Sequence, residues 1–159
     1  MKIKRMIETT PKTEKAVIVG LIYKDQDEKQ AQPEEESKFR ALYEDAPLAY
    51  QSLDKNGDFL NINKAWTRLL GYEKEEVIGK NFGDFMTEES RQAYRTGFSC
   101  FLRDGEVRKV ERDMICKDGT VLTVSIEGRI SYDEQGTPLR THCIFHDVTE
   151  SKKAREALL

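Results

Sequence analysis

Three cysteines and two histidines are the side chains of this sequence best suited to metal binding, redox chemistry or nucleophilic catalysis. Cys100, Cys116 and Cys143 are far apart and odd in number, which argues against a disulfide framework and favours a reducing compartment. Zinc sites need Cys and His ligands at short spacing. Only His142, Cys143 and His146 are close in sequence, and in a strand both histidines would face away from Cys143. We therefore expect no metal site, and we expect the cysteines to fill the core.

No other set of residue types suggests an active site. The acidic clusters at 73–76 and 84–89 are typical of solvated faces and helix starts. The sequence shows neither a Ser/His/Asp set at a catalytic spacing nor the GK[ST] loop that nucleotide hydrolysis needs. The net charge of −3, with both signs interspersed, does not provide the basic face that nucleic-acid binding requires. We expect a chain that is not an enzyme and binds no nucleic acid.

The first 35 residues differ from the rest of the chain. The run AVIVGLIY at 16–23 is β-branched and apolar, which is typical of one strand. A charged stretch follows from 24 to 38. The apolar run is far shorter than the roughly 20 residues of a membrane helix, and no secretion signal is visible. We expect residues 1–35 to form a strand and a charged linker, and the protein to be cytoplasmic without a membrane segment.

After residue 36 the sequence alternates between strand and helix patterns. Asn56-Gly57 would supply the positive φ angles of a hairpin turn. Asn63 can cap a helix that Gly71 ends. The pattern predicts a helix from 37 to Pro47, strands at 48–53 and 59–62, a helix between Asn63 and Gly71, helical turns at 74–77 and 82–85, a helix at 88–102, and strands at 106–116, 121–131 and 139–146. This order predicts an α+β fold in which helices pack on one face of an antiparallel sheet.

Two of these segments carry more detailed expectations. The strand at 121–131 places Leu122, Val124, Ile126 and Ile130 on one face and Thr123, Ser125, Glu127 and Arg129 on the other. The closing segment DVTESKKAREALL has a helical pattern, and either Asp147 or Thr149 can cap its first turn. Its apolar stripe is too short for a stable isolated helix. We expect residues 149–159 to begin a helix that continues into another domain.

These motifs together resemble a known family. The segment FRALYEDAPLAYQSLDKNGDFLNINKAWTRLLGYEKEEVIGKNF resembles the first half of a PAS domain, and KDGTVLTVSIEGRISYDEQGTPLRTHCIFHDVTESKKAREAL resembles the second half with its exit helix. The resemblance implies a PAS domain over 36–148: a five-stranded antiparallel sheet with an N-terminal cap helix and a small pocket between sheet and helices. It also implies that Asp147, Val148 and Thr149 transmit signals to an output helix. Separately, TEKAVIVGLIYKDQDEKQAQ at 13–32 resembles the start of HflX-type GTPases.

The resemblance leaves the cofactor unknown. Flavin photosensors of the family carry a cysteine in a segment like GxNCRFL, but here GKNFGDF places Phe82 at that position, so the covalent flavin bond cannot form. Haem sensors of the family typically take an axial histidine from the long helix, and 88–102 contains none. His146 stands at a strand end and not on a dimerisation helix, which argues against a phospho-accepting role.

A ligand pocket is one of two interpretations of the apolar side chains between sheet and helices. The candidates are Ile62, Trp66, Leu70, Phe82, Phe98, Met114, Leu122, Val124 and Phe145. They would hold a small apolar or aromatic ligand. The other interpretation is that they fill the core, because large voids are costly. Asn63 and Arg112 would supply polar contacts if they point inward, although cap and surface roles compete.

The expected function is that of a regulatory input domain in a signalling protein such as a histidine kinase or diguanylate cyclase. It would sense a small ligand or relay signals through its C-terminal helix, as a homodimer with a C-terminal effector domain as partner. The alternative is a ligand-free dimerisation scaffold.

Overall fold

The structure is a computed structural model that describes residues 33–159, so the strand expected at 16–23 and the GTPase-like segment 13–32 lie outside the described residues. The chain divides after Tyr43 into two units, of which the second is residues 44–159. Helix α3 (Pro33–Glu44) begins before the expected residue 37. Proline suits the first turn of a helix, where its missing N–H costs no hydrogen bond. Three glutamates in the same turn complement the positive end of the helix dipole.

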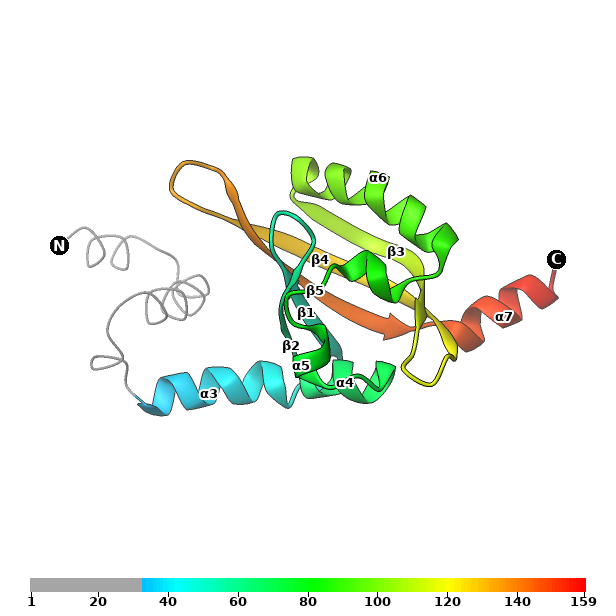
Figure 1. The fold of residues 1–159 in the computed structure, drawn as a ribbon, viewed down its shortest axis with the longest axis horizontal. Coiled ribbons are helices and arrows are strands. Elements are labelled where there is room, and N and C mark those ends of the chain that lie inside the picture. Colours follow the sequence, from blue (N-terminus) through cyan, green and yellow to red (C-terminus); the bar gives the residue numbers. More distant parts are fainter. Residues whose placement is uncertain (1–32) are drawn as a thin grey trace. The chain divides into compact units, whose positions relative to one another are not determined.

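The second unit is built on a five-stranded sheet with the spatial order β2-β1-β5-β4-β3 (Figure 1). Its strands are β1 (Ala49–Leu53), β2 (Phe59–Ile62), β3 (Glu106–Ile115), β4 (Val121–Tyr132) and β5 (Pro138–Asp147). Every pairing is antiparallel. The last strand, β5, lies at the centre of the sheet because it pairs with both β1 and β4. The predicted α+β fold with a five-stranded antiparallel sheet is confirmed.

The turn between β1 and β2 differs in detail from the expected one. Gly57 has a φ of 84°, but Asn56 does not have a positive φ. Asp54 Oδ1 instead organises the turn by accepting hydrogen bonds from the backbone N–H groups of Asn56 at 2.8 Å and Asp58 at 3.0 Å. The connection is therefore longer than the two-residue hairpin loop that Asn-Gly favours.

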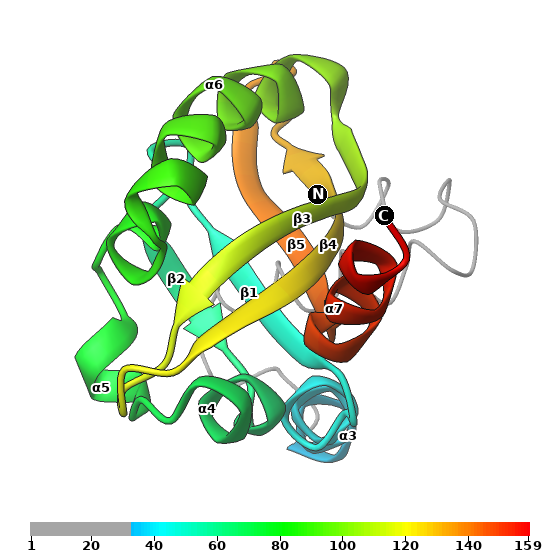
Figure 2. The same cartoon turned by 90° about the vertical axis from the view of Figure 1, so that its right-hand side faces the viewer.

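Four helical segments connect β2 to β3 and cover one face of the sheet (Figure 2). They are α4 (Lys64–Leu70), α5 (Lys74–Val77), the 3-10 helix η1 (Phe82–Phe85) and α6 (Glu88–Asp104). The Asn63 side chain caps α4 by accepting from the Trp66 N–H, and Gly71 ends it with a φ of 83°. Thr87 caps α6 in the same way. The core lies between these helices and the sheet.

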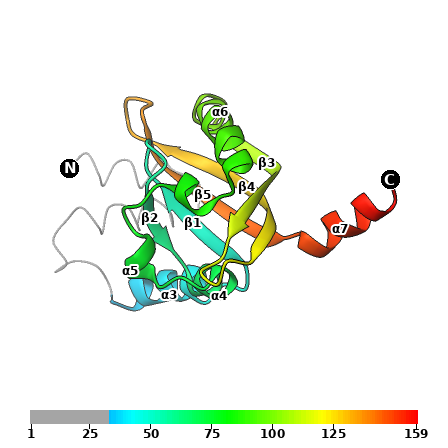
Figure 3. The same ribbon diagram turned by 45° about the vertical axis from the view of Figure 1, so that its right-hand side comes forward.

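The final helix, α7 (Thr149–Ala157), follows directly from the end of β5 (Figure 3). It contains no buried residue. An isolated helix of this length is marginal in water. Its position therefore depends on contacts with the sheet, which are described below.

Candidate functional site

The nine side chains predicted to line a pocket all belong to the hydrophobic core or pack against it. Seven are buried: Ile62, Trp66, Leu70, Phe82, Met114, Val124 and Phe145. The other two, Phe98 and Leu122, are partly buried against the same cluster. The structure thus brings the predicted side chains together, and ligand binding among them stays a prediction.

Aromatic rings fill the centre of this cluster. Phe82 stacks on Phe145 with ring centroids 5.7 Å apart and meets Phe59 edge to face at 5.6 Å. Phe59 also meets Trp66 edge to face at 5.4 Å. Such offset and edge-to-face pairs are the favoured arrangements of aromatic rings. A ligand entering here would have to move at least one of these rings.

One polar side chain lies within this apolar cluster. Gln51 on β1 is fully buried, and its Oε1 accepts a hydrogen bond from Trp66 Nε1 at 3.2 Å. Its Nε2 has no hydrogen-bond partner among the described residues. An unpaired buried donor costs about 1–3 kcal/mol. The sequence analysis did not single out Gln51. A polar glutamine at a position of β1 that alternation points toward the core could have identified it.

The side chain of Asn63, which the sequence left open as a cap or a polar contact to a ligand, caps α4. Its Oδ1 accepts from the backbone N–H groups of Tyr50 at 2.9 Å and Trp66 at 3.0 Å. Its Nδ2 donates to the Leu48 carbonyl at 2.9 Å. These bonds tie the start of α4 to β1 and leave Asn63 committed to the backbone.

The junction between β5 and α7 consists of Asp147, Val148 and Thr149. Asp147 Oδ1 accepts from the Thr149 backbone N–H at 3.0 Å and from its hydroxyl at 2.6 Å. Thr149 Oγ1 in turn accepts from the Thr123 N–H on β4 at 3.0 Å. Val148 occupies the cap position without a side-chain bond. Of the two residues considered as caps, Asp147 satisfies a free helix N–H and Thr149 bridges to β4.

Thr123 on β4 is buried, although the alternation of apolar and polar residues places it on the polar face of that strand. Only 6% of its surface is exposed. Its carbonyl accepts from the Val148 N–H at 2.8 Å, and its hydroxyl donates to Asp113 Oδ1 at 2.6 Å. The junction therefore covers Thr123, a contact that the alternation within β4 could not indicate.

Two ion pairs join α7 to β3. Lys152 Nζ lies 3.2 Å from Asp113 Oδ1, and Arg155 Nη2 lies 2.6 Å from Glu111 Oε1. The two acids are two residues apart on one strand and share a face. The two basic residues are three apart on a helix and share a side. Polar contacts therefore hold α7 against the sheet.

Comparison with family models decides what kind of domain this is. The model described as "PAS fold" matches residues 37–148, well over half of the chain. The chain belongs to the PAS family. The resemblance read from the two sequence segments is confirmed, and the junction at 147–149 lies at the end of the matched region.

Curated relatives of this PAS domain are sensors. A methyl sulfide methyltransferase-associated sensor of Methanosarcina acetivorans is 24% identical over 143 residues. The sensor histidine kinase TmoS of Ectopseudomonas mendocina is 23% identical over 124 residues. These alignments cover 89% and 77% of this chain but 14% and 13% of the two relatives. The chain thus spans about one seventh of the length of these proteins.

Solved PAS domains share the fold. The PAS domain of an HTR-like protein from Haloarcula marismortui gives a TM-score of 0.63 at 26% identity, over 72% of this chain and 92% of that one. A PAS domain from Colwellia psychrerythraea gives a TM-score of 0.65 at 21% identity, over 72% and 97%.

Phe82 and His142, considered above for flavin and metal chemistry, have the following surroundings in this PAS domain. Phe82, at the position of the flavin-reactive cysteine, is a buried ring of the core. His142 lies on β5, where its Nδ1 is 2.8 Å from Tyr50 Oη and its Nε2 is 2.7 Å from Ser131 Oγ.

Within residues 33–159, no three or more His, Cys, Asp or Glu side chains converge as a metal site. In the same range, no helix combines the length and apolar character needed to cross a bilayer.

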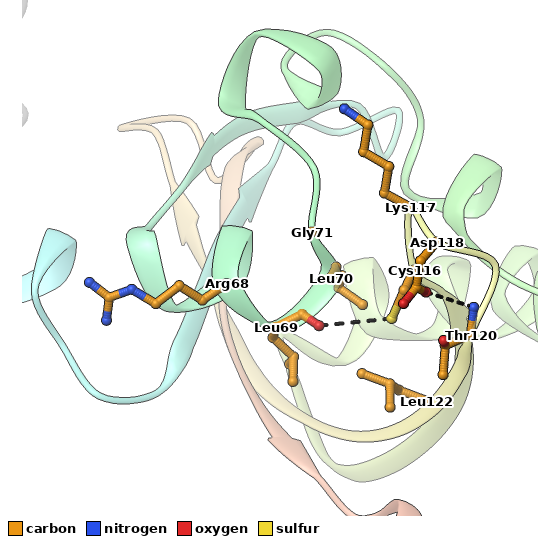
Figure 4. A pocket seen from close by; sticks show the side chains of 9 residues that line it. All are labelled: Arg68, Leu69, Leu70, Gly71, Cys116, Lys117, Asp118, Thr120 and Leu122. Carbon is orange, nitrogen blue, oxygen red and sulfur yellow. Dashed lines mark hydrogen bonds between the residues drawn. The ribbon is translucent and has the colours of Figure 1, made fainter.

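An open cleft of about 470 Å³ lies where the end of α4 meets the turn between β3 and β4 (Figure 4). It is lined by Arg68, Leu69, Leu70, Gly71, Cys116, Lys117, Asp118, Thr120 and Leu122. Cys116 Sγ lies 3.8 Å from the Leu69 carbonyl oxygen, and the Lys117 N–H donates to the Leu70 carbonyl at 2.9 Å. These contacts hold the turn between β3 and β4 against the C-terminal end of α4. Only Leu70 and Leu122 of the predicted pocket residues line this cleft.

Burial is expected to protect two of the three cysteines from alkylation. It raises the pKa of the Cys143 thiol to about 12 and also raises the pKa of Cys116. Because the thiolate is the nucleophile, iodoacetamide at pH 8 should label the half-buried Cys100 first. Raising the pH to 9 should leave Cys143 unlabelled, whereas unfolding in urea should expose all three. Mass mapping that finds Cys143 alkylated as fast as Cys100 would contradict its burial.

Proposed function

We propose that this PAS domain is the sensory input of a signal-transduction protein and passes a change in its sheet to α7. The observation that carries the proposal is the junction, where the Thr149 hydroxyl bonds to Asp147 at the end of β5 and to Thr123 on β4. A relative movement of these two strands changes the start of α7 directly. The curated relatives described above are sensors, which supports this role.

The energetics of α7 suit a relay. A solvent-exposed ion pair such as Arg155–Glu111 contributes about 0–1 kcal/mol, the Lys152–Asp113 pair is only partly buried, and the helix buries no residue. The docked and released positions of α7 therefore differ by a small free energy. A ligand that favours one arrangement of the sheet by about 1–3 kcal/mol shifts this balance by roughly 5–150-fold.

For the complete protein we propose a C-terminal histidine kinase as effector, a homodimeric assembly and a cytoplasmic location. The kinase assignment is supported by the relative that is a sensor histidine kinase. A diguanylate cyclase is the other effector class consistent with an input domain of this kind. The phosphoryl chemistry would belong to the effector, because the chain has no nucleotide-binding motif.

A ligand-free dimerisation scaffold is the second candidate, and one observation favours it. The side chains predicted to line a pocket pack against one another as a dense aromatic core. A domain of this kind would set the geometry of a dimer without binding a small molecule.

Native mass spectrometry of the full chain purified from cells distinguishes the two candidates. A co-purifying small molecule that is released on denaturation supports sensing. A dimer with the mass of two bare chains supports the scaffold and contradicts ligand sensing. Trp66→Phe should weaken retention of such a ligand while leaving the dimer intact, because the ring lies in the core.

Replacing Asp113 with alanine is expected to loosen α7 without unfolding the domain. The change removes the ion pair with Lys152 and the acceptor of the Thr123 hydroxyl. Hydrogen exchange measured by mass spectrometry should show amides of residues 149–157 exchanging about fivefold faster. Glu150→Gln is the matched control, because the one ion pair of Glu150 within residues 33–159 is with Lys153 on the same helix. Equal exchange in both variants would contradict the role of Asp113 in docking α7.

A further inference from the structure

An arginine on the helix-covered face of the sheet pairs with no carboxylate in the part of the chain that the structure describes. Arg112 on β3 is directly opposite Val124 on β4, whose side chain is fully buried in the core. Residues directly opposite in an antiparallel pair share a face, so Arg112 extends from the inner face. Its Nη1 donates to the Glu111 carbonyl at 2.7 Å. No Asp or Glu of the described residues forms an ion pair with it.

The Arg112 guanidinium approaches helix α6 at Gly97. A Cβ built on Gly97 would lie 2.9 Å from Arg112 Nη2. Gly97 is the only glycine within α6, and glycine is among the least favourable residues for a helix interior. The close approach of the Arg112 guanidinium explains why α6 has a glycine at position 97, because a larger side chain there would collide with it.

The surroundings of Arg112 favour an anion. Burial lowers the pKa of Arg112 by desolvating its guanidinium, and no carboxylate of residues 33–159 forms an ion pair with it. A partly desolvated cation without a counter-ion is unfavourable until an anion pairs with it. Aromatic rings lie next to Gly97 on α6: the Phe98 ring is 5.3 Å from that of Tyr94 and 6.3 Å from that of Phe101. Tyr94 and Phe101 are buried and Phe98 packs against the same core, so the face of α6 that approaches Arg112 near Gly97 also carries aromatic side chains.

We propose that the ligand of this PAS domain is a small carboxylate with an aromatic or apolar body, and that Arg112 binds the carboxylate. This inference rests on the proposed sensing function and specifies its ligand class. The planar guanidinium donates two parallel hydrogen bonds to a carboxylate. The rings of α6 contact the apolar body, and binding joins β3 to α6. Because β3 also carries the two acids that pair with α7, the bound anion lies on the strand that holds the exit helix.

Calorimetric titration of the full chain with benzoate and with benzamide tests the proposal, because the two molecules match in shape and differ in charge. Benzoate is expected to bind at least about tenfold more tightly than benzamide. In Arg112→Gln this preference should vanish. In Gly97→Ala the new methyl group occupies the space of Nη2 and should weaken benzoate binding, although alanine favours the helix. Arg108→Gln is the control, because Arg108 is exposed and paired with Glu106, and it should bind benzoate like the unmodified chain.

Equal affinities for benzoate and benzamide, or no binding of benzoate, would overturn the carboxylate assignment. Benzoate binding that survives Arg112→Gln unchanged would overturn the role of Arg112. Far-UV circular dichroism confirms that each variant is folded, and Gly97→Ala tests the same contact from α6 if Arg112→Gln does not fold. The sensing function is judged separately by the co-purifying ligand in native mass spectrometry, so the two failures are distinguishable.

Discussion

Replacing Trp66 with alanine is expected to lower the free energy of unfolding by about 3–5 kcal/mol. The side chain is completely buried, and its ring meets Phe59 at 5.4 Å and Phe85 at 6.2 Å. Truncation removes these ring contacts and leaves a cavity. It also removes the Nε1 donor, so the amide of the buried Gln51 loses its hydrogen bond. Urea denaturation followed by far-UV circular dichroism measures the loss, because the variant has no tryptophan left to report by fluorescence.

Two further variants make the Trp66 result specific. Leu60→Ala is the control, because Leu60 is 39% exposed on β2 and should cost less than about 1 kcal/mol. Trp66→Phe keeps a ring but loses Nε1, and it should cost less than the alanine variant if that variant is too unstable to fold. A Trp66→Ala variant no less stable than Leu60→Ala would contradict the central position of Trp66 in the core.

Replacing Gly128 with alanine is expected to lower the free energy of unfolding by about 1–3 kcal/mol through overpacking at the centre of the sheet. Gly128 on β4 is opposite Cys143 on β5. An added Cβ would collide with Cys143 Sγ and lie 2.8 Å from the His142 carbonyl oxygen. Both strands would have to separate locally at this pair. Thermal unfolding of the full chain should show a lower midpoint for this variant.

A double-mutant cycle with Cys143→Ala identifies the cause of that loss. Removing Sγ relieves the closest contact, so Gly128→Ala should cost less in the Cys143→Ala background than in the unmodified chain. The contact with the His142 carbonyl remains, so the rescue should be partial. Strictly additive effects would show that the two positions do not touch and would contradict the register of β4 against β5.

The elements of this fold could be predicted because their signals are local. Asn63 and Gly71 bound α4 as expected, since a cap side chain and a left-handed glycine act within a few residues of the helix end. The order of strands and helices follows from periodicity, and it was sufficient to predict a five-stranded antiparallel sheet. The turn at Asn56-Gly57 was less predictable in detail, because the Asp54 side chain selects a longer connection.

The succession of elements, the family and the side chains that fill the core could all be inferred from the amino-acid sequence. The contacts between distant side chains became visible only in the fold: Gln51 with Trp66, Gly97 with Arg112, and Asp113 with both Thr123 and Lys152. The physical reason is that periodicity describes neighbours on one helix or strand, whereas these partners lie on different elements. Strand register and helix docking bring them together, and neither can be inferred from the residue pattern of a single segment.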